Sequence, residues 1–120
     1  MSRRCSVLVI DDDPDLIELE TQILESAGYD VRCARDGLEG LERVTERMPN
    51  LILLDMRMPR MSGTEFAREF RRRHGRACPI IVITAAENAH ARAREVGAEG
   101  FFSKPFEIDE LLNAAKRLVS

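Results

Sequence analysis

Short apolar segments alternate along the chain with longer segments in which apolar residues recur at helical spacing. Because this alternation continues to the C-terminus, it predicts five strands that are each followed by a helix. Three of the short segments are unbroken aliphatic runs, which is typical of strands buried on both faces of a parallel sheet. The predicted strands span residues 7–10, 30–34, 51–54, 80–83 and 100–102.

The longer segments predict amphipathic helices with recognisable ends. Pro14 can begin the first helix and Gly28 can end it, while the second starts near Asp36 and ends before Pro49. A fourth helix, over about residues 87–96, has an apolar face of mostly small side chains, so we expect it to be the most mobile. The positions expected to face the core are Leu16, Ile17, Ile23, Leu24, Ala27, Leu38, Leu41, Val44, Met48, Phe66, Ala67, Phe70, Ala89, Ala93, Val96, Ile108, Leu111, Leu112, Ala115 and Leu118.

Five strand–helix units in 120 residues are too few for an eight-stranded barrel. The remaining architecture is an α/β fold, in which an open, doubly wound parallel sheet carries helices on both faces. The chain contains no internal repeat, linker or low-complexity segment. We therefore expect one domain over residues 1–120.

The composition agrees with one such domain and excludes several classes of function. The chain has 18 Lys+Arg and 21 Asp+Glu with both signs interleaved, so neither a membrane surface nor direct nucleic-acid binding is expected. No apolar run approaches transmembrane length, and the run at residues 7–10 is too short for a signal peptide. The 3 cysteines are widely spaced without CxxC pairs, which favours a reducing cytoplasm.

Unusual polar residues follow the predicted strands, at the edge where an open parallel sheet places its ligand site. Clustered carboxylates need a counter-cation to stay ionised, and all-oxygen ligands favour Mg²⁺. A hydroxyl and an ammonium group are the partners that a phosphoryl group on a nearby carboxylate would need. A carboxylate beside a metal can itself attack phosphorus. The residues are Asp11, Asp12, Asp13, Asp55, Thr84 and Lys104.

Some of these residues, and the most basic stretch, have a plainer interpretation. Asp13 stands before Pro14 and is most simply a helix N-cap. A helix cap is also the alternative for Thr84. The arginines within residues 71–76 lie at a predicted helix C-terminus, where cations complement the helix dipole, so we interpret them as a solvated face.

Several motifs, in order along the whole chain, resemble the response-regulator receiver domain, the phosphoacceptor module of two-component signalling. The motifs are VIDDD at 9–13, DG at 36–37, LLDMRMP at 53–59, MSG at 61–63, ITA at 83–85 and KPF at 104–106. The resemblance implies a flavodoxin-like three-layer sandwich, similar to chemotaxis regulators, with strand order 2-1-3-4-5. It also implies that a histidine kinase's phosphohistidine, or a small acyl phosphate, donates a phosphoryl group to one aspartate.

The resemblance assigns the acidic residues to phosphoryl acceptance and metal binding. Asp55 would be the phosphoacceptor. Asp12 would bind Mg²⁺ (or Mn²⁺) directly, and Asp11 would act mainly through metal-bound water. The remaining metal ligands from the protein would be Asp55 and the backbone carbonyl of Arg57.

The resemblance also implies a set of residues that detect the phosphoryl group. Thr84, helped by the Ala85 amide, and Lys104 would contact its oxygens. Phe101 matches the aromatic switch position, which turns inward when Thr84 moves. Because Phe101 has no hydroxyl group, its ring cannot report this change through a hydrogen bond.

Two further positions bear on how long the phosphoryl group lasts. In the family, the residues matching Arg57 and Ala86 influence this lifetime. Arg57 could shield the acyl phosphate or contact a partner, whereas Ala86 cannot position an attacking water. We therefore expect slow self-dephosphorylation.

The function predicted from this resemblance is a signalling switch that catalyses its own phosphorylation and dephosphorylation and is otherwise no enzyme. Its expected partners are a histidine kinase or phosphotransfer protein and a downstream effector. Phosphorylation would change the surface of helix 4, strand 5 and helix 5, in a monomer or a phosphorylation-dependent dimer. Alternatives are a haloacid-dehalogenase-like phosphohydrolase, suggested by the spacing of Asp11 and Asp13, and a phosphorylation-independent receiver scaffold. A nucleotide-binding flavodoxin-like module is weaker, because no glycine-rich loop follows the first strand.

Overall fold

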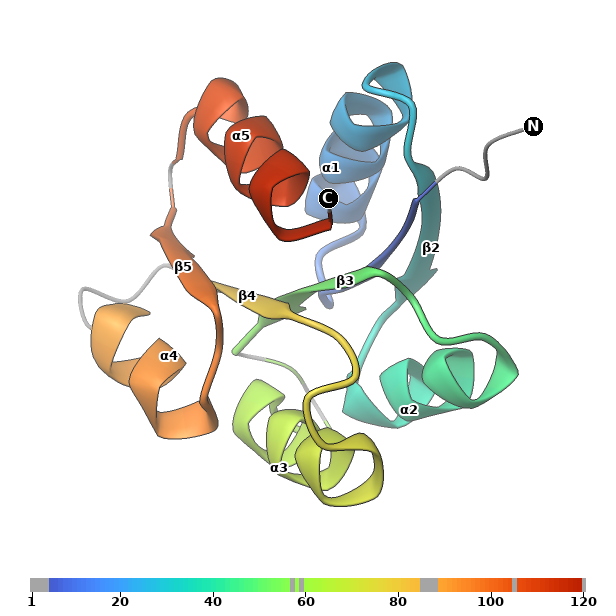
Figure 1. The fold of residues 1–120 in the computed structure, drawn as a ribbon, viewed down its shortest axis with the longest axis vertical. Coiled ribbons are helices and arrows are strands. Elements are labelled where there is room, and N and C mark those ends of the chain that lie inside the picture. The colour runs from blue at the N-terminus through green and yellow to red at the C-terminus, as the bar shows by residue number, and fades with distance from the viewer. Residues whose placement is uncertain (1–4, 57, 59, 85–88, 105, 120) are drawn as a thin grey trace.

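The computed structural model describes residues 5–56, 58, 60–84, 89–104 and 106–119, and Figure 1 shows their arrangement. Five parallel strands form one sheet in the order β2-β1-β3-β4-β5, with α1 and α5 on one face and α2, α3 and α4 on the other. The predicted doubly wound α/β fold is therefore confirmed. The elements are β1 (Ser6–Ile10), α1 (Pro14–Ser26), β2 (Asp30–Ala34), α2 (Gly37–Glu46), β3 (Leu51–Asp55), α3 (Gly63–His74), β4 (Ile80–Thr84), α4 (Ala89–Val96), β5 (Gly100–Ser103) and α5 (Ile108–Val119).

The central strands β1, β3 and β4 are buried along their whole length, as their unbroken aliphatic sequences predict. In the ladder, Ile10 pairs with Leu54, and Leu54 pairs with Val82. The carboxyl ends of these strands therefore meet at one edge of the sheet. The chain order reverses between β1 and β3, so this edge also contains the switch point where doubly wound sheets bind ligands.

Two apolar cores lie on opposite faces of the sheet, because successive strand residues point to opposite sides. Ile52 and Leu54 belong to the core that includes Phe66 and Phe70 of α3. Leu51 and Leu53 belong to the core beneath α1 and α5. Continuing the alternation along β3 places Asp55 on the face covered by α1 and α5.

Polar caps define where the first three helices begin. Asp13 is the N-cap of α1, where its side chain accepts a hydrogen bond from the Asp15 N–H at 3.0 Å. The cap interpretation of Asp13 is therefore confirmed. Asp36 caps α2, and Ser62 forms a capping box with Glu65 at the start of α3.

Some residues expected in the core lie elsewhere. Leu38 is 42% exposed on α2 and Ile108 is 50% exposed at the start of α5. Ala27 lies beyond the last residue of α1, as its exposed C-cap. The prediction of these three side chains as core residues is wrong, because helical spacing alone does not set where a helix ends or how it is rotated on the sheet.

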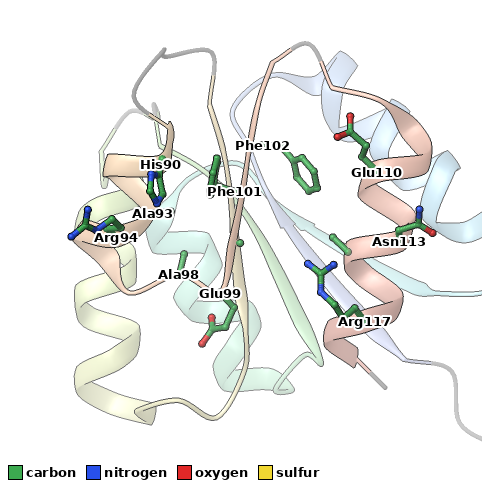
Figure 2. A pocket seen from close by; sticks show the side chains of 12 residues that line it. His90, Ala93, Arg94, Ala98, Glu99, Phe101, Phe102, Glu110, Asn113 and Arg117 are labelled. Atoms are coloured by element: carbon green, nitrogen blue, oxygen red, sulfur yellow. The ribbon is translucent and has the colours of Figure 1, made fainter.

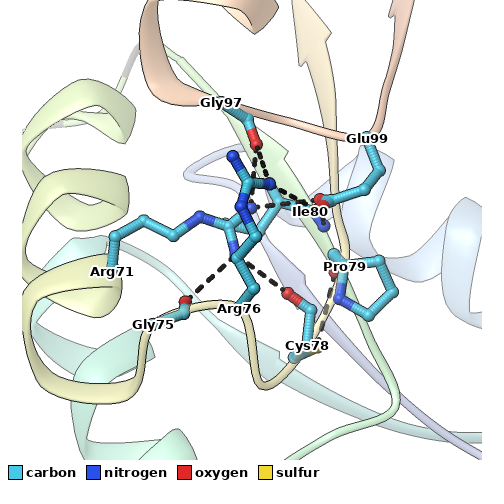
Figure 3. Close-up of polar contacts among 8 residues, drawn as sticks. All are labelled: Arg71, Gly75, Arg76, Cys78, Pro79, Ile80, Gly97 and Glu99. Atoms are coloured by element: carbon cyan, nitrogen blue, oxygen red, sulfur yellow. Dashed lines mark hydrogen bonds and ion pairs between the residues drawn. The ribbon is translucent and has the colours of Figure 1, made fainter.

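A polar network ties α3 to the amino-terminal edge of the sheet, opposite the predicted ligand site (Figure 3). Arg71 Nη2 and the Ile80 N–H donate to the same Glu99 oxygen, at 3.0 and 2.8 Å. Arg71 and Arg76 also donate hydrogen bonds to backbone carbonyls, those of Gly75, Cys78 and Gly97. The network therefore joins α3, the start of β4 and the connection between α4 and β5.

Arg71 thus differs from its neighbours on α3. Its side chain is 17% exposed, so the prediction that it belongs to a solvated face is wrong. The side chains of Arg72 and Arg73 are 69% and 44% exposed and pair with Glu69 at the surface, as a solvated face requires. Sequence spacing did not distinguish these arginines, because the carbonyls that Arg71 contacts come from distant segments.

Candidate functional site

Three aspartates from two adjacent strand ends form an acidic cluster. One carboxylate oxygen from each of Asp11, Asp12 and Asp55 lies within 4.8 Å of the others. Asp11 and Asp55 are 2% and 6% exposed, whereas Asp12 is exposed to solvent. The cluster thus combines two buried carboxylates with one that faces water.

Lys104 supplies a cation to this cluster. Its Nζ lies 3.6 Å from Asp11 Oδ2 and 3.9 Å from Asp55 Oδ1. The Lys104 N–H donates to the Thr84 carbonyl at 2.8 Å, which extends the β4–β5 ladder past Ser103 and fixes the backbone beneath the ammonium group. Three carboxylates around one ammonium group leave negative charge uncompensated, and the all-oxygen donor set fits a hard divalent cation such as Mg²⁺.

The backbone after β1 orients the first carboxylate. Asp11 Oδ1 accepts a hydrogen bond from the Asp13 N–H at 2.9 Å, and the Asp11 N–H donates to the Ala34 carbonyl at 3.0 Å. Asp13 in turn caps α1. The three consecutive aspartates therefore divide their roles: Asp11 and Asp12 join the cluster, while Asp13 starts a helix.

The segment after Asp55 is held close to the site by tight packing. A Cβ atom on Gly63 would lie 2.6 Å from the Asp55 carbonyl oxygen and 2.8 Å from Met56 Cα, so this position requires glycine. In the same segment Arg60 adopts a positive φ of 63° and forms an ion pair with Asp36. These contacts join the β3–α3 connection to the starts of α2 and α3.

Thr84 and Phe101 lie on the other face of the sheet. Thr84 ends β4 and is 2% exposed, and its register partner is Ser103. Phe101 pairs with Val82 and therefore lies on the same face as Thr84, one step back along β5. Phe101 is 44% exposed, so its side chain is directed outward in the structure.

The remaining residues of the predicted site fall outside the described part of the chain. They are Arg57, Ala85 and Ala86. Their assigned roles in metal binding, phosphoryl contact and phosphoryl lifetime stay predictions.

The sequence prediction missed Glu20, a buried acid on α1. Glu20 is 1% exposed, and its Oε2 has no hydrogen-bond partner among the described residues. Its pKa is raised to about 7, chiefly by burial; the negative charge of Asp11 contributes to this increase and Lys104 opposes it. The available signal was an acidic residue between Ile17 and Leu24 on the face of α1 that packs against the sheet.

A separate groove of about 580 Å³ lies between α4, β5 and α5 (Figure 2). Phe101 and His90 form part of its lining on the α4 side, and Arg117 lies on the α5 side. The groove contains none of the clustered aspartates. It is thus a surface distinct from the acidic cluster.

Comparison with known proteins agrees with this geometry. A family model described as the response regulator receiver domain matches residues 7–116. The response regulator MprA of a Mycobacterium species is 36% identical over 115 residues, covering 94% of this chain and 50% of the relative. The DNA-binding dual master transcriptional regulator RpaA of Synechocystis is 34% identical over 116 residues, covering 94% and 48%.

A solved structure of a chemotaxis protein from Vibrio cholerae superimposes with a TM-score of 0.87 and 30% identity, covering 97% of this chain and 99% of that protein. The chain therefore matches this structure along nearly its whole length, but spans about half the length of the curated relatives. Among the described residues, the structure contains no helix with the length and apolar character needed to cross a membrane.

Proposed function

Because this chain belongs to the response regulator receiver domain family, we propose that Asp55 accepts a phosphoryl group in a two-component phosphorelay. The donor is a phosphohistidine on a histidine kinase or phosphotransfer protein, or a small acyl phosphate. One observation carries the proposal: the Lys104 ammonium lies within 4 Å of both Asp11 and Asp55, beside the exposed Asp12. A phosphoryl group on Asp55 would therefore meet a cation and a metal-binding carboxylate pair.

The residues of the cluster have separate tasks in the transfer. Asp11, Asp12 and Asp55, with the Arg57 carbonyl, would hold Mg²⁺ (or Mn²⁺), which neutralises charge on the transferred phosphoryl group. An Asp55 carboxylate oxygen attacks phosphorus and forms a P–O bond. The bond from phosphorus to the donor breaks at the same time: a P–N bond that releases the imidazole of a phosphohistidine, or a P–O bond that releases the carboxylate of an acyl phosphate. Lys104 stabilises the negative charge on a phosphoryl oxygen and holds it toward the sheet.

The output follows from residues on the opposite face. In the proposal, Thr84 and the Ala85 amide bond to phosphoryl oxygens, and Phe101 turns inward into the space that Thr84 leaves. The change alters the surface of α4, β5 and α5, which meets a downstream effector domain or protein. The phosphoryl group selects one of two conformations, so its effect is a shift in their populations.

The direct test is incubation with acetyl phosphate and Mg²⁺ followed by intact-mass measurement. We expect one phosphoryl adduct that is absent from Asp55→Asn and from a metal-free sample. Asp109→Asn, at an exposed aspartate of α5, is the matched control and should form the adduct normally. An adduct in Asp55→Asn, or no adduct in the folded protein, would contradict the proposal.

The same assay tests the phosphoryl lifetime and the phosphohydrolase alternative. After removal of the donor the adduct should decay slowly, because Ala86 cannot position an attacking water. Rapid decay with Mg²⁺ and no added phosphatase would contradict this expectation. Steady release of inorganic phosphate from added phosphate monoesters would favour a phosphohydrolase instead.

A further inference from the structure

His90 on α4 and Phe101 on β5 form an aromatic pair at the edge of the groove (Figure 2). Their ring centroids are 5.0 Å apart and their planes differ by 27°. Stacked rings at this separation attract each other beyond the apolar area that they bury. The contact is therefore a specific restraint on an aromatic side chain that stays 44% exposed with the stack in place.

The restraint acts where α4 has few other large contacts. In the part of α4 whose side chains the structure describes, the buried residues are Ala93 and Val96. Small side chains remove little apolar surface from water, so they anchor the helix weakly. The stack on Phe101 therefore adds an aromatic contact between α4 and β5 to the contacts of these small side chains.

The position of Phe101 in the sheet connects this stack to Thr84. Phe101 and Thr84 lie on the same face of adjacent strands, because their register partners are Val82 and Ser103. In the structure the ring stacks on His90 from its outward position, so a rotation inward toward Thr84 would give up this contact.

We propose that His90 is a positioning residue whose stack on Phe101 holds this ring outward and opposes the conformational change that accompanies phosphorylation of Asp55. The inference rests on the function proposed above and adds a residue that sets the balance between the two states. Loss of the stack should move the equilibrium toward the inward state by about threefold to tenfold. The inward state is the more reactive one in this proposal, so a larger population of it should raise the rate of phosphorylation by up to the same factor.

Two variants separate the stack from a general role of the helix. His90→Ala should be phosphorylated by acetyl phosphate faster than the unmodified protein, by up to about tenfold. His90→Phe retains an aromatic ring and should restore the original rate. Arg92→Ala, at an exposed residue of the same helix, is the matched control and should leave the rate unchanged. Circular dichroism confirms that each variant is folded.

Proton NMR of the two histidines reports on the stack directly. The chain has 2 histidines, and His74 is 5.2 Å from the Phe70 ring on α3, which makes it an internal control. With acetyl phosphate and Mg²⁺, the His90 ring protons should lose the ring-current shift from Phe101. The His74 protons should not move.

The outcomes distinguish this inference from the proposed function. If the adduct forms on Asp55 while His90 keeps its ring-current shift, or if His90→Ala reacts at the original rate, the proposed role of His90 is wrong and the receiver function stands. If no adduct forms in the unmodified protein, the receiver function fails and the role of His90 fails with it. Acceleration in His90→Ala, rescue by His90→Phe and loss of the shift together support the inference.

Discussion

Replacing Glu20 with glutamine should stabilise the protein, and the gain should grow as the pH rises. Glu20 is 1% exposed within the layer formed by α1 and the sheet. Burial, the largest cause, and the negative charge of Asp11 together raise its pKa from 4.5 to about 7, against the opposing effect of Lys104. Between pH 4.5 and about pH 7, Glu20 therefore keeps its proton in the folded protein but loses it in the unfolded chain. The protein is therefore most stable below the pKa that Glu20 has in the unfolded chain, and its stability falls as the pH rises through the pKa that Glu20 has in the folded protein.

The size of this effect follows from the two pKa values. Each unit of pKa difference corresponds to about 1.4 kcal/mol of differential interaction. The increase from 4.5 to about 7 therefore lowers the free energy of unfolding by about 3 kcal/mol at pH 8. Glutamine has nearly the same shape but cannot ionise, so the Glu20→Gln protein should lack this pH-dependent loss.

Urea unfolding in metal-free buffer at pH 5, 6, 7 and 8 measures the difference. The gain for Glu20→Gln over the unmodified protein should increase by about 2–3 kcal/mol between pH 5 and pH 8, because a small part of the loss is already present at pH 5. Glu25→Gln, at an exposed residue of the same helix, is the matched control and should show no such trend. A difference for Glu20→Gln that is the same at pH 5 and pH 8 would refute the reasoning, because it would mean that Glu20 ionises alike in the folded and unfolded states.

Three further predictions concern the framework of the fold. Gly63→Ala should lower the free energy of unfolding by about 1–3 kcal/mol in urea and slow phosphorylation, because its Cβ would meet backbone atoms; equal stability would contradict this. Arg71→Ala should cost about 2 kcal/mol by the same measurement, whereas the exposed Arg72→Ala should cost less than about 0.5 kcal/mol; equal costs would be inconsistent with the network. Asp36→Ala should cost about 1 kcal/mol at pH 7 through loss of the α2 cap. Burial raises the pKa of Asp36, but hydrogen bonds from the Glu39 N–H and Arg60 outweigh burial, so the pKa is lowered overall. The stability that Asp36 contributes should therefore disappear as the pH falls below about 4. A cost of Asp36→Ala that persists below this pH would contradict the prediction.

Local patterns in the sequence were sufficient for the elements and for the location of the candidate site. Each predicted strand is present, and β2 spans the predicted residues 30–34. Aliphatic runs have this predictive power because burial on both faces of a parallel sheet requires them. The convergence of Asp11, Asp55 and Lys104 also followed, since carboxyl ends of parallel strands share one edge. Their chemical roles, and those of Arg57, Ala85 and Ala86, stay predictions.

Contacts between distant segments were not available from these patterns. The stack of His90 on Phe101 depends on how α4 lies against β5, and the burial of Arg71 depends on carbonyls supplied from across the fold. The exposure of Leu38 depends in the same way on the rotation of α2 against the sheet.

The sequence by itself determined the order of strands and helices along the chain, because hydrophobic periodicity and capping residues act over a few neighbouring positions. It also determined which edge of the sheet carries the acidic residues, because chain direction is the same in every parallel strand. Only the tertiary structure decided that Glu20 is buried without a full set of hydrogen bonds and that Phe101 stacks on His90. Both depend on the rotation and docking of whole helices, which is set by packing summed over both cores and not by any local pattern.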